Sequence, residues 1–176
     1  MPLLRNGRAV HDPWLPVGDG APLPADGAIV VGFDRFAADA ERLAGRNGAL
    51  GVRLRNTDDA RALAGHVGRL CLIVLEFPKY TDGRAYSQAR LLRERLGYAG
   101  ELRAAGNVLL DQLMFMQRCG FDAFEIDRPD AELAWRKAFA AFETFYQPTD
   151  DGRATILERR RQALARAGEP GRAAGD

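Results

Sequence analysis

The chain has 176 residues, of which 47% are hydrophobic and 28% are charged, so it can bury the core of one domain but not of two ordinary ones. Its 25 basic side chains nearly balance its 24 acidic ones, and the formal net charge of +1 gives no overall field that would attract nucleic acid or a membrane surface. No stretch approaches the roughly 20 apolar residues of a membrane span, and the N-terminus lacks an apolar signal core. We therefore expect a soluble cytoplasmic protein that binds neither nucleic acid nor a membrane.

The first residues differ in composition from the rest of the chain. Residues 1–27 contain five prolines and several glycines, which predicts an irregular N-terminal arm. From residue 28, short apolar runs alternate with longer segments of helical period, as in successive βα units around a mainly parallel sheet. The expected strands are 28–32, 49–55, 70–77, 101–105 and 122–126, and the expected helices are 34–45, 57–66, 84–96, 107–118 and 130–145.

This pattern predicts an α/β domain over residues 28–147. About five βα units are too few to close an eight-stranded barrel, which leaves an open doubly wound sheet or a partial barrel. Residues 148–176 are predicted to form a basic helix, with three consecutive arginines at 159–161, and then a disordered tail. That helix is either a solvated charged face or a docking element for a partner.

The densest group of polar and aromatic side chains follows the apolar strand 70–77. Ligands of parallel α/β proteins bind at the carboxyl edge of the sheet, where the loops after the strands present unpaired backbone N–H groups. We therefore expect a site in this loop and in the helix that follows it. Its candidate ligand-binding residues are Lys79, Tyr80, Thr81, Asp82, Arg84, Ser87 and Gln88.

Neighbouring units bring further side chains to the same edge. Arg103, Asn107 and Gln112 complete the candidate ligand-binding set. If the strands are parallel, Arg103 converges with Lys79, Arg84 and either Arg53 or Arg55, and such a group of cations suits phosphate, sulfate or carboxylate. In the alternative, Arg53 and Arg103 pair with carboxylates on adjacent strands, for which the candidates are Glu76, Glu125 and Asp127.

The residues do not decide whether the chain is an enzyme. Asp82, Asp111 and Glu76 are the candidates for proton transfer, although no spacing identifies a catalytic pair. Two cysteines and two histidines exclude a disulfide scaffold, a Cys-ligated iron–sulfur cluster and a His-rich metal centre, so we expect no metal. We interpret Cys71 as a core residue and Cys119 as a structural thiol. Neither GxGxxG nor GxxxxGK[ST] follows a strand, so no nucleotide cofactor is expected.

Several linked motifs carry a family resemblance. They are Phe77-Pro78-Lys79-Tyr80-Thr81-Asp82-Gly83-Arg84, the segment 86–93, Gly100-Glu101-Leu102-Arg103-Ala104, Asp111-Gln112 and Arg118-Cys119-Gly120-Phe121-Asp122-Ala123-Phe124. With them the chain resembles a bacterial family of unknown function over residues 28–126. Members of that family are often labelled probable oxidoreductases of sulfite reduction, and their genes tend to lie beside those for sulfite reductase. The resemblance therefore implies a role in sulfur assimilation.

A stand-alone oxidoreductase needs a redox centre, for which this chain offers no recognised binding motif. The sequence thus predicts an accessory or partner protein of assimilatory sulfite reduction that binds an oxyanion or an anionic metabolite. A small-molecule enzyme at the same site and a pure interaction module, docking through the basic helix, are the alternatives. The expected partners are an anionic small molecule and proteins of the sulfite reductase system, and a homodimer is left open.

Overall fold

The computed structural model describes residues 3–140 together with Glu158 and Arg161. Within these residues it contains eight strands, which are β1 (Leu3–Arg5), β2 (Arg8–Val10), β3 (Leu15–Val17), β4 (Ile29–Gly32), β5 (Leu50–Leu54), β6 (Leu72–Phe77), β7 (Glu101–Gly106) and β8 (Ala123–Glu125). The α-helices are α1 (Phe33–Ala44), α2 (Arg84–Arg90), α3 (Leu113–Arg118) and α4 (Ala131–Ala140). The chain is therefore an α/β protein, as predicted.

All eight strands belong to one open, curled sheet, which resembles half of a barrel. The strand order is β2-β1-β8-β7-β6-β5-β4-β3. Neighbours from β3 to β8 pair in parallel, whereas β1 pairs antiparallel with both β8 and β2. The sheet is thus mixed. From β4 to β8 the order follows the chain without the reversal that defines a doubly wound sheet, so that alternative is wrong.

Two of the expected helices are shorter than predicted. In place of an α-helix, segment 57–66 forms the 3-10 helix Ala60–Leu63, and a second 3-10 helix, Val67–Arg69, follows it. Gly65 lies between these two short helices, and glycine is a poor helix former. Segment 107–118 is helical only from the 3-10 turn Leu110–Gln112 onward. The helix expected over 84–96 is present, with α2 continuing as a π-helix over Leu91–Arg95.

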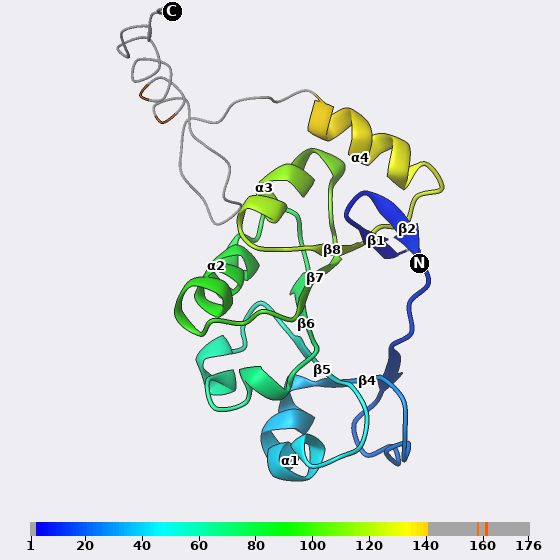
Figure 1. Ribbon diagram of the computed structural model, residues 1–176, viewed down its shortest axis with the longest axis vertical. Coiled ribbons are helices and arrows are strands. Elements are labelled where there is room, and N and C mark those ends of the chain that lie inside the picture. The colour runs from blue at the N-terminus through cyan, green and yellow to red at the C-terminus, as the bar shows by residue number, and fades with distance from the viewer. Residues whose placement is uncertain (1–2, 141–157, 159–160, 162–176) are drawn as a thin grey trace, which may run out of the picture.

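The prediction of an irregular N-terminal arm is wrong, because this segment supplies three strands. Asn6 and Gly7 both have positive φ, 49° and 77°, which is the geometry of a type I′ turn, and they join β1 to β2 as a hairpin. β2 and β3 lie at opposite edges of the sheet. The four residues between them, 11–14, therefore cross from one edge to the other, as Figure 1 shows, and are called the strap below.

The alternation of side chains along the strands separates two apolar layers. On the outer face, α1, α2 and α3 lie against the sheet (Figure 1), and Ile73, Leu75 and Phe77 of β6 point into this main core. On the concave face, a smaller cluster of Val30, Leu72, Val74 and Ala105 packs beneath Trp14 of the strap. Leu72 to Leu75 are fully buried, as expected of a central strand. Cys71, immediately before β6, is exposed and not a core residue, whereas Cys119 is buried.

Only part of the predicted C-terminal structure falls within the described residues. The helix expected over 130–145 is present as α4 from Ala131 to Ala140. Residues 141–147 and the predicted basic helix and tail, 148–176, lie outside the described residues apart from Glu158 and Arg161, which are helical. In the described part of the chain, no helix is both long enough and apolar enough to cross a membrane.

Candidate functional site

Two pockets open at the carboxyl edge of the sheet. The smaller, here called the arginine pocket, has a volume of about 210 Å³ and lies at the ends of β4, β5 and β6. It is lined by Asp19, Gly32, Phe33, Asp34, Arg53, Arg55 and Glu76. The larger, here called the β8 pocket, has a volume of about 400 Å³. It is lined by Gly106, Asn107, Val108, Glu125, Ile126, Asp127 and Arg128.

Arg53 is the basic residue of the arginine pocket that is held most loosely. Its Nη1 lies 3.4 Å from Glu76 Oε1 and its Nη2 lies 3.1 Å from Glu125 Oε1. The first distance is longer than an ordinary N–H···O hydrogen bond, and each carboxylate contacts the guanidinium through one oxygen only. The side chain is 34% exposed. Arg53 thus presents part of its donor fork to the pocket.

The neighbouring arginine is bound more tightly. Arg55 Nε and Nη2 donate to Asp58 Oδ1 at 3.0 and 2.8 Å, and Nη2 also donates to Asp34 at 2.8 Å. The Asp58 side chain, which raises the pKa of Arg55, is only 6% exposed. A ligand that used Arg55 would therefore have to compete with a well-placed carboxylate.

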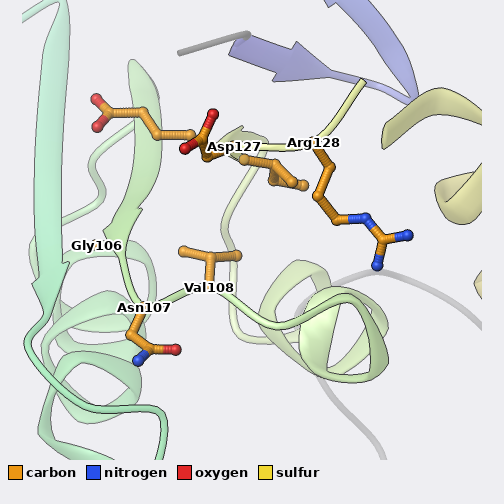
Figure 2. A pocket seen from close by; sticks show the side chains of 7 residues that line it. Gly106, Asn107, Val108, Asp127 and Arg128 are labelled. Carbon is orange, nitrogen blue, oxygen red and sulfur yellow. The ribbon is translucent and has the colours of Figure 1, made fainter. Parts of the chain in front are cut away.

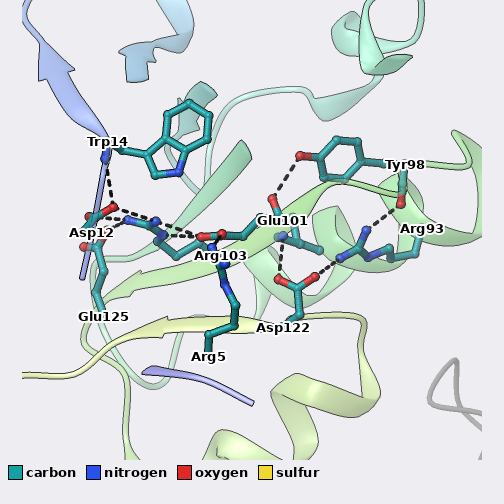
Figure 3. Close-up of polar contacts among 10 residues, drawn as sticks. Arg5, Asp12, Trp14, Arg93, Tyr98, Glu101, Arg103, Asp122 and Glu125 are labelled. Atoms are coloured by element: carbon teal, nitrogen blue, oxygen red, sulfur yellow. Dashed lines mark hydrogen bonds and ion pairs between the residues drawn. The ribbon is translucent and has the colours of Figure 1, made fainter. Parts of the chain in front are cut away.

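Arg103 occupies a different place from the one predicted. Its position on β7 directs it to the concave face, where it is 2% exposed, and not to the loops at the carboxyl edge. Figure 3 shows its guanidinium between Asp12 of the strap and Glu101. The shortest bonds to these two carboxylates are 2.8 Å each, and Glu125 lies at 3.4 Å. The predicted pairing with carboxylates on other strands is present for Arg53, which contacts Glu76 and Glu125, but Arg103 reaches Glu125 only at 3.4 Å and makes its shorter bonds to Asp12 and Glu101. The structure does not bring Arg103 together with Lys79 and Arg84.

The carboxyl group of Asp12 links the strap to this buried cation. Burial would raise its pKa, but the hydrogen bonds from Arg103 and from the Trp14 backbone N–H, with the charge of Arg103, outweigh burial and lower it. Asp12 is therefore ionised near neutral pH. Sequence reasoning missed Asp12 and Glu101, although the period-two spacing of Glu101 and Arg103 could have placed both on one face of the strand.

The loop between β6 and α2 forms its own polar cluster. Arg84 donates from Nε and Nη2 to the two oxygens of Asp82, at 3.0 and 2.6 Å, and Asn56 donates to Asp82 at 2.6 Å. The Arg84 hydrogen bonds lower the pKa of Asp82 to about 2. A carboxylate with this pKa carries no proton near neutrality, which disfavours Asp82 as a general acid.

Two glutamines among the predicted ligand-binding residues hold backbone in the structure. Gln88 is buried and donates from Nε2 to the carbonyls of Arg55 and Asp58, at 3.0 and 2.8 Å. Gln112 donates to the carbonyl of Tyr80 at 3.2 Å. These contacts fix the loops after β5 and β6 against α2 and the 3-10 turn before α3. Both side chains thus hold the backbone of these loops in position at the carboxyl edge of the sheet.

The remaining predicted residues are exposed around this edge. Within the described part of the chain, the Lys79 side chain makes no hydrogen bond or ion pair, and Asn107 lines the β8 pocket. The others are Tyr80, Thr81, Ser87 and Asp111. Of the three candidates for proton transfer, only Glu76 lines a pocket described here, where it contacts Arg53. No group of three His, Cys, Asp or Glu side chains in the described residues is placed to hold a metal ion.

The chain matches the model of a known protein family. The model of a bacterial protein family of unknown function (DUF934) matches residues 51–157, which is more than half of the chain. The matched segment starts in β5 and contains both Arg53 and the loop after β6. A comparison with curated proteins finds no match.

Proposed function

The chain belongs to this bacterial family of unknown function, and we propose that it serves assimilatory sulfite reduction as an accessory or partner protein that binds an oxyanion or anionic metabolite at the carboxyl edge of the sheet. The observation that carries the binding part is Arg53, whose guanidinium lines the arginine pocket with a long contact to Glu76 and an ordinary one to Glu125, each through a single carboxylate oxygen. A planar fork of N–H donors suits a sulfur or phosphorus oxyanion, which accepts two such bonds at once.

An oxyanion can take the place of Glu76 at Arg53 because only one long contact is given up. An entering oxyanion replaces the 3.4 Å contact with Glu76, while the 3.1 Å contact with Glu125 is retained. Glu76 is 35% exposed and can turn to water when it is released. The sulfur part of the proposal rests on the resemblance carried by the motif Phe77–Arg84 and its linked segments.

A partner role is supported by apolar surface near the same edge. Tyr80 and Phe115 are 51% and 54% exposed, and the bond from Gln112 to the Tyr80 carbonyl ties their segments together. Exposed aromatic side chains are typical anchors of protein interfaces. This surface gives an accessory protein a means to contact another protein of its system. A small-molecule enzyme using Glu76 and Arg53 remains the alternative.

Thermal denaturation with added ligands tests the binding part. Sulfate, sulfite, adenylylated sulfate and flavins are each added to the wild-type chain and to Arg53→Ala, with Arg42→Ala as the control, since Arg42 forms an exposed pair with Asp39 on α1. A ligand at 100 times its Kd stabilises the native state by about 2.7 kcal/mol. We expect sulfite or sulfate to raise the Tm of the wild type and of the control but not of Arg53→Ala. Equal shifts in all three proteins would refute the role of Arg53.

A further inference from the structure

The ion pair between Arg53 and Glu125 forms the boundary between the two pockets. Arg53 lines the arginine pocket, Glu125 lines the β8 pocket, and their Nη2 and Oε1 atoms are 3.1 Å apart. A ligand that covers this boundary therefore meets a positive group and a negative group side by side. A site of this kind distinguishes between ligands by the arrangement of their charges.

The two pockets differ in the charge that they offer. The arginine pocket presents the guanidinium of Arg53, since that of Arg55 is held by Asp58 and Asp34. The β8 pocket presents the carboxylates of Glu125 and Asp127, because the guanidinium of Arg128 is held by Asp130 through bonds of 2.8 and 2.7 Å. Figure 2 shows Asp127 and Arg128 on the segment that faces the turn at Gly106, Asn107 and Val108.

A plain anion meets repulsion as well as attraction at Arg53. Glu76 and Glu125 both contact Arg53, and Asp34 lines the same pocket. Each of these carboxylates repels an entering anion over a few ångströms, in a partly shielded pocket where such repulsion is stronger than in water. A positive group on the ligand that faces Glu125 offsets the part of this repulsion that comes from Glu125.

We propose that the natural ligand is a zwitterion of the α-amino-acid type, with its oxyanion group on Arg53 in the arginine pocket and its ammonium group on Glu125 and Asp127 in the β8 pocket. The inference rests on the proposed function and specifies the ligand of that same site. An α-amino acid carries its two charges on one carbon, a spacing that matches the adjacent Arg53 and Glu125 groups. Each charge of the ligand then meets an opposite charge, while Glu76, which is 35% exposed, is released to water.

The pocket sizes agree with this orientation. Small-molecule sites usually measure 300–1,000 Å³. The β8 pocket, at about 400 Å³, falls in that range and can take the body of a ligand as well as its ammonium group. The arginine pocket, at about 210 Å³, is smaller and suits a charged head group alone.

Isothermal titration calorimetry with matched ligands tests the inference. L-serine and L-cysteine carry both charges, N-acetyl-L-serine lacks the ammonium, L-serine methyl ester lacks the carboxylate, and sulfate is the plain anion. We expect each amino acid to bind the wild-type chain at least tenfold more tightly than N-acetyl-L-serine, the methyl ester or sulfate. Glu125→Gln should remove this preference.

A second variant is needed because Glu125 also contacts buried Arg103, so Glu125→Gln changes a contact of the fold as well as the site. Asp127 is exposed, and Asp127→Asn should weaken amino-acid binding about fivefold or more and leave sulfate binding unchanged. If sulfate binds through Arg53 but the amino acids bind no better than N-acetyl-L-serine, the inference is overturned and the proposed function stands. If no ligand in the panel binds the wild type, both are overturned.

Discussion

Arg53 on β5 and Glu125 on β8 form an ion pair with 3.1 Å between Nη2 and Oε1, although β6 and β7 lie between their strands. Neighbouring strands are about 4.8 Å apart, so three spacings in a flat sheet would separate the two backbones by roughly 14 Å. The curl of the half-barrel turns both side chains toward a common interior and makes the contact possible. The charged groups of the carboxyl edge therefore converge because the sheet is curved.

The first prediction concerns Arg103, the buried cation beneath this pair. Replacing it with alanine leaves Asp12, Glu101 and Glu125 without their shared partner on the concave face. Asp12 then has no ion-pair partner, whereas Glu101 keeps Arg5 and Glu125 keeps Arg53. Because the buried network loses its central cation, we expect Arg103→Ala to lower the free energy of unfolding by about 3 kcal/mol. Denaturant melts measure this loss, and Arg42→Ala should stay within about 0.5 kcal/mol of the wild type. A loss below about 1 kcal/mol for Arg103→Ala would show that the network is not buried as described.

The second prediction concerns the strap. Trp14 covers the small apolar cluster formed by Val30, Leu72, Val74 and Ala105, and is itself only partly buried. Trp14→Ala should destabilise the fold by about 1.5–3 kcal/mol, less than the loss of a fully buried tryptophan. Pro13→Ala is the matched control, since Pro13 is exposed in the same segment. Equal stability of the two variants in denaturant melts would argue against a packed strap.

The third prediction concerns Gly106 at the end of β7. Its φ is +89°, and a Cβ atom there would lie 2.5 Å from the Phe77 carbonyl oxygen. Gly97 has a φ of +64° but open space around it. The Gly97→Ala variant therefore measures the cost of the backbone conformation without a clash. Gly97→Ala should cost about 1–2 kcal/mol from the left-handed conformation alone. Gly106→Ala should cost more in the same melts because of the clash, and a smaller cost would contradict the close approach of the two loops.

The fourth prediction concerns acid stability and Asp82. The pKa of this carboxyl is lowered by Arg84 from 3.8 to about 2 in the folded chain. A group with a depressed folded pKa stabilises the fold above its unfolded pKa, and this contribution disappears as the pH falls through the folded value. The stability difference between the wild type and Asp82→Asn should be constant above pH 5 and shrink between about pH 4 and pH 2. A difference that does not change over this range would rule out the Asp82–Arg84 interaction.

The central strands were predictable because their signal is local. The apolar runs at 28–32, 49–55, 70–77, 101–105 and 122–126 became β4 to β8, with ends that differ by at most two residues. The N-terminal strands were missed because the prolines outweighed a stronger hairpin signal. Asn6-Gly7, between the short segments Leu3-Leu4-Arg5 and Arg8-Ala9-Val10, is the dipeptide that a type I′ turn favours.

The site was predictable only in part. The loop after β6 lies at the carboxyl edge of parallel strands, and its place follows from strand direction alone. The partner of each arginine could not be chosen from sequence, since Arg53 meets Glu125 through sheet curvature and Arg103 meets Asp12 through the strap. Both contacts join residues more than 70 positions apart. Such pairings depend on the whole fold.

The central claim is that an oxyanion binds at Arg53 on the carboxyl edge of the sheet. Titration of the ¹⁵N-labelled chain with sulfite, followed by ¹H–¹⁵N correlation spectra, tests it most directly because it locates the ligand. The account predicts shift changes at the Arg53 and Arg55 amides and side-chain Nε–H groups and at Glu76, with saturation and with loss in Arg53→Ala. Saturating changes confined to the arginine-rich segment 153–166, or changes that persist unaltered in Arg53→Ala, would contradict it.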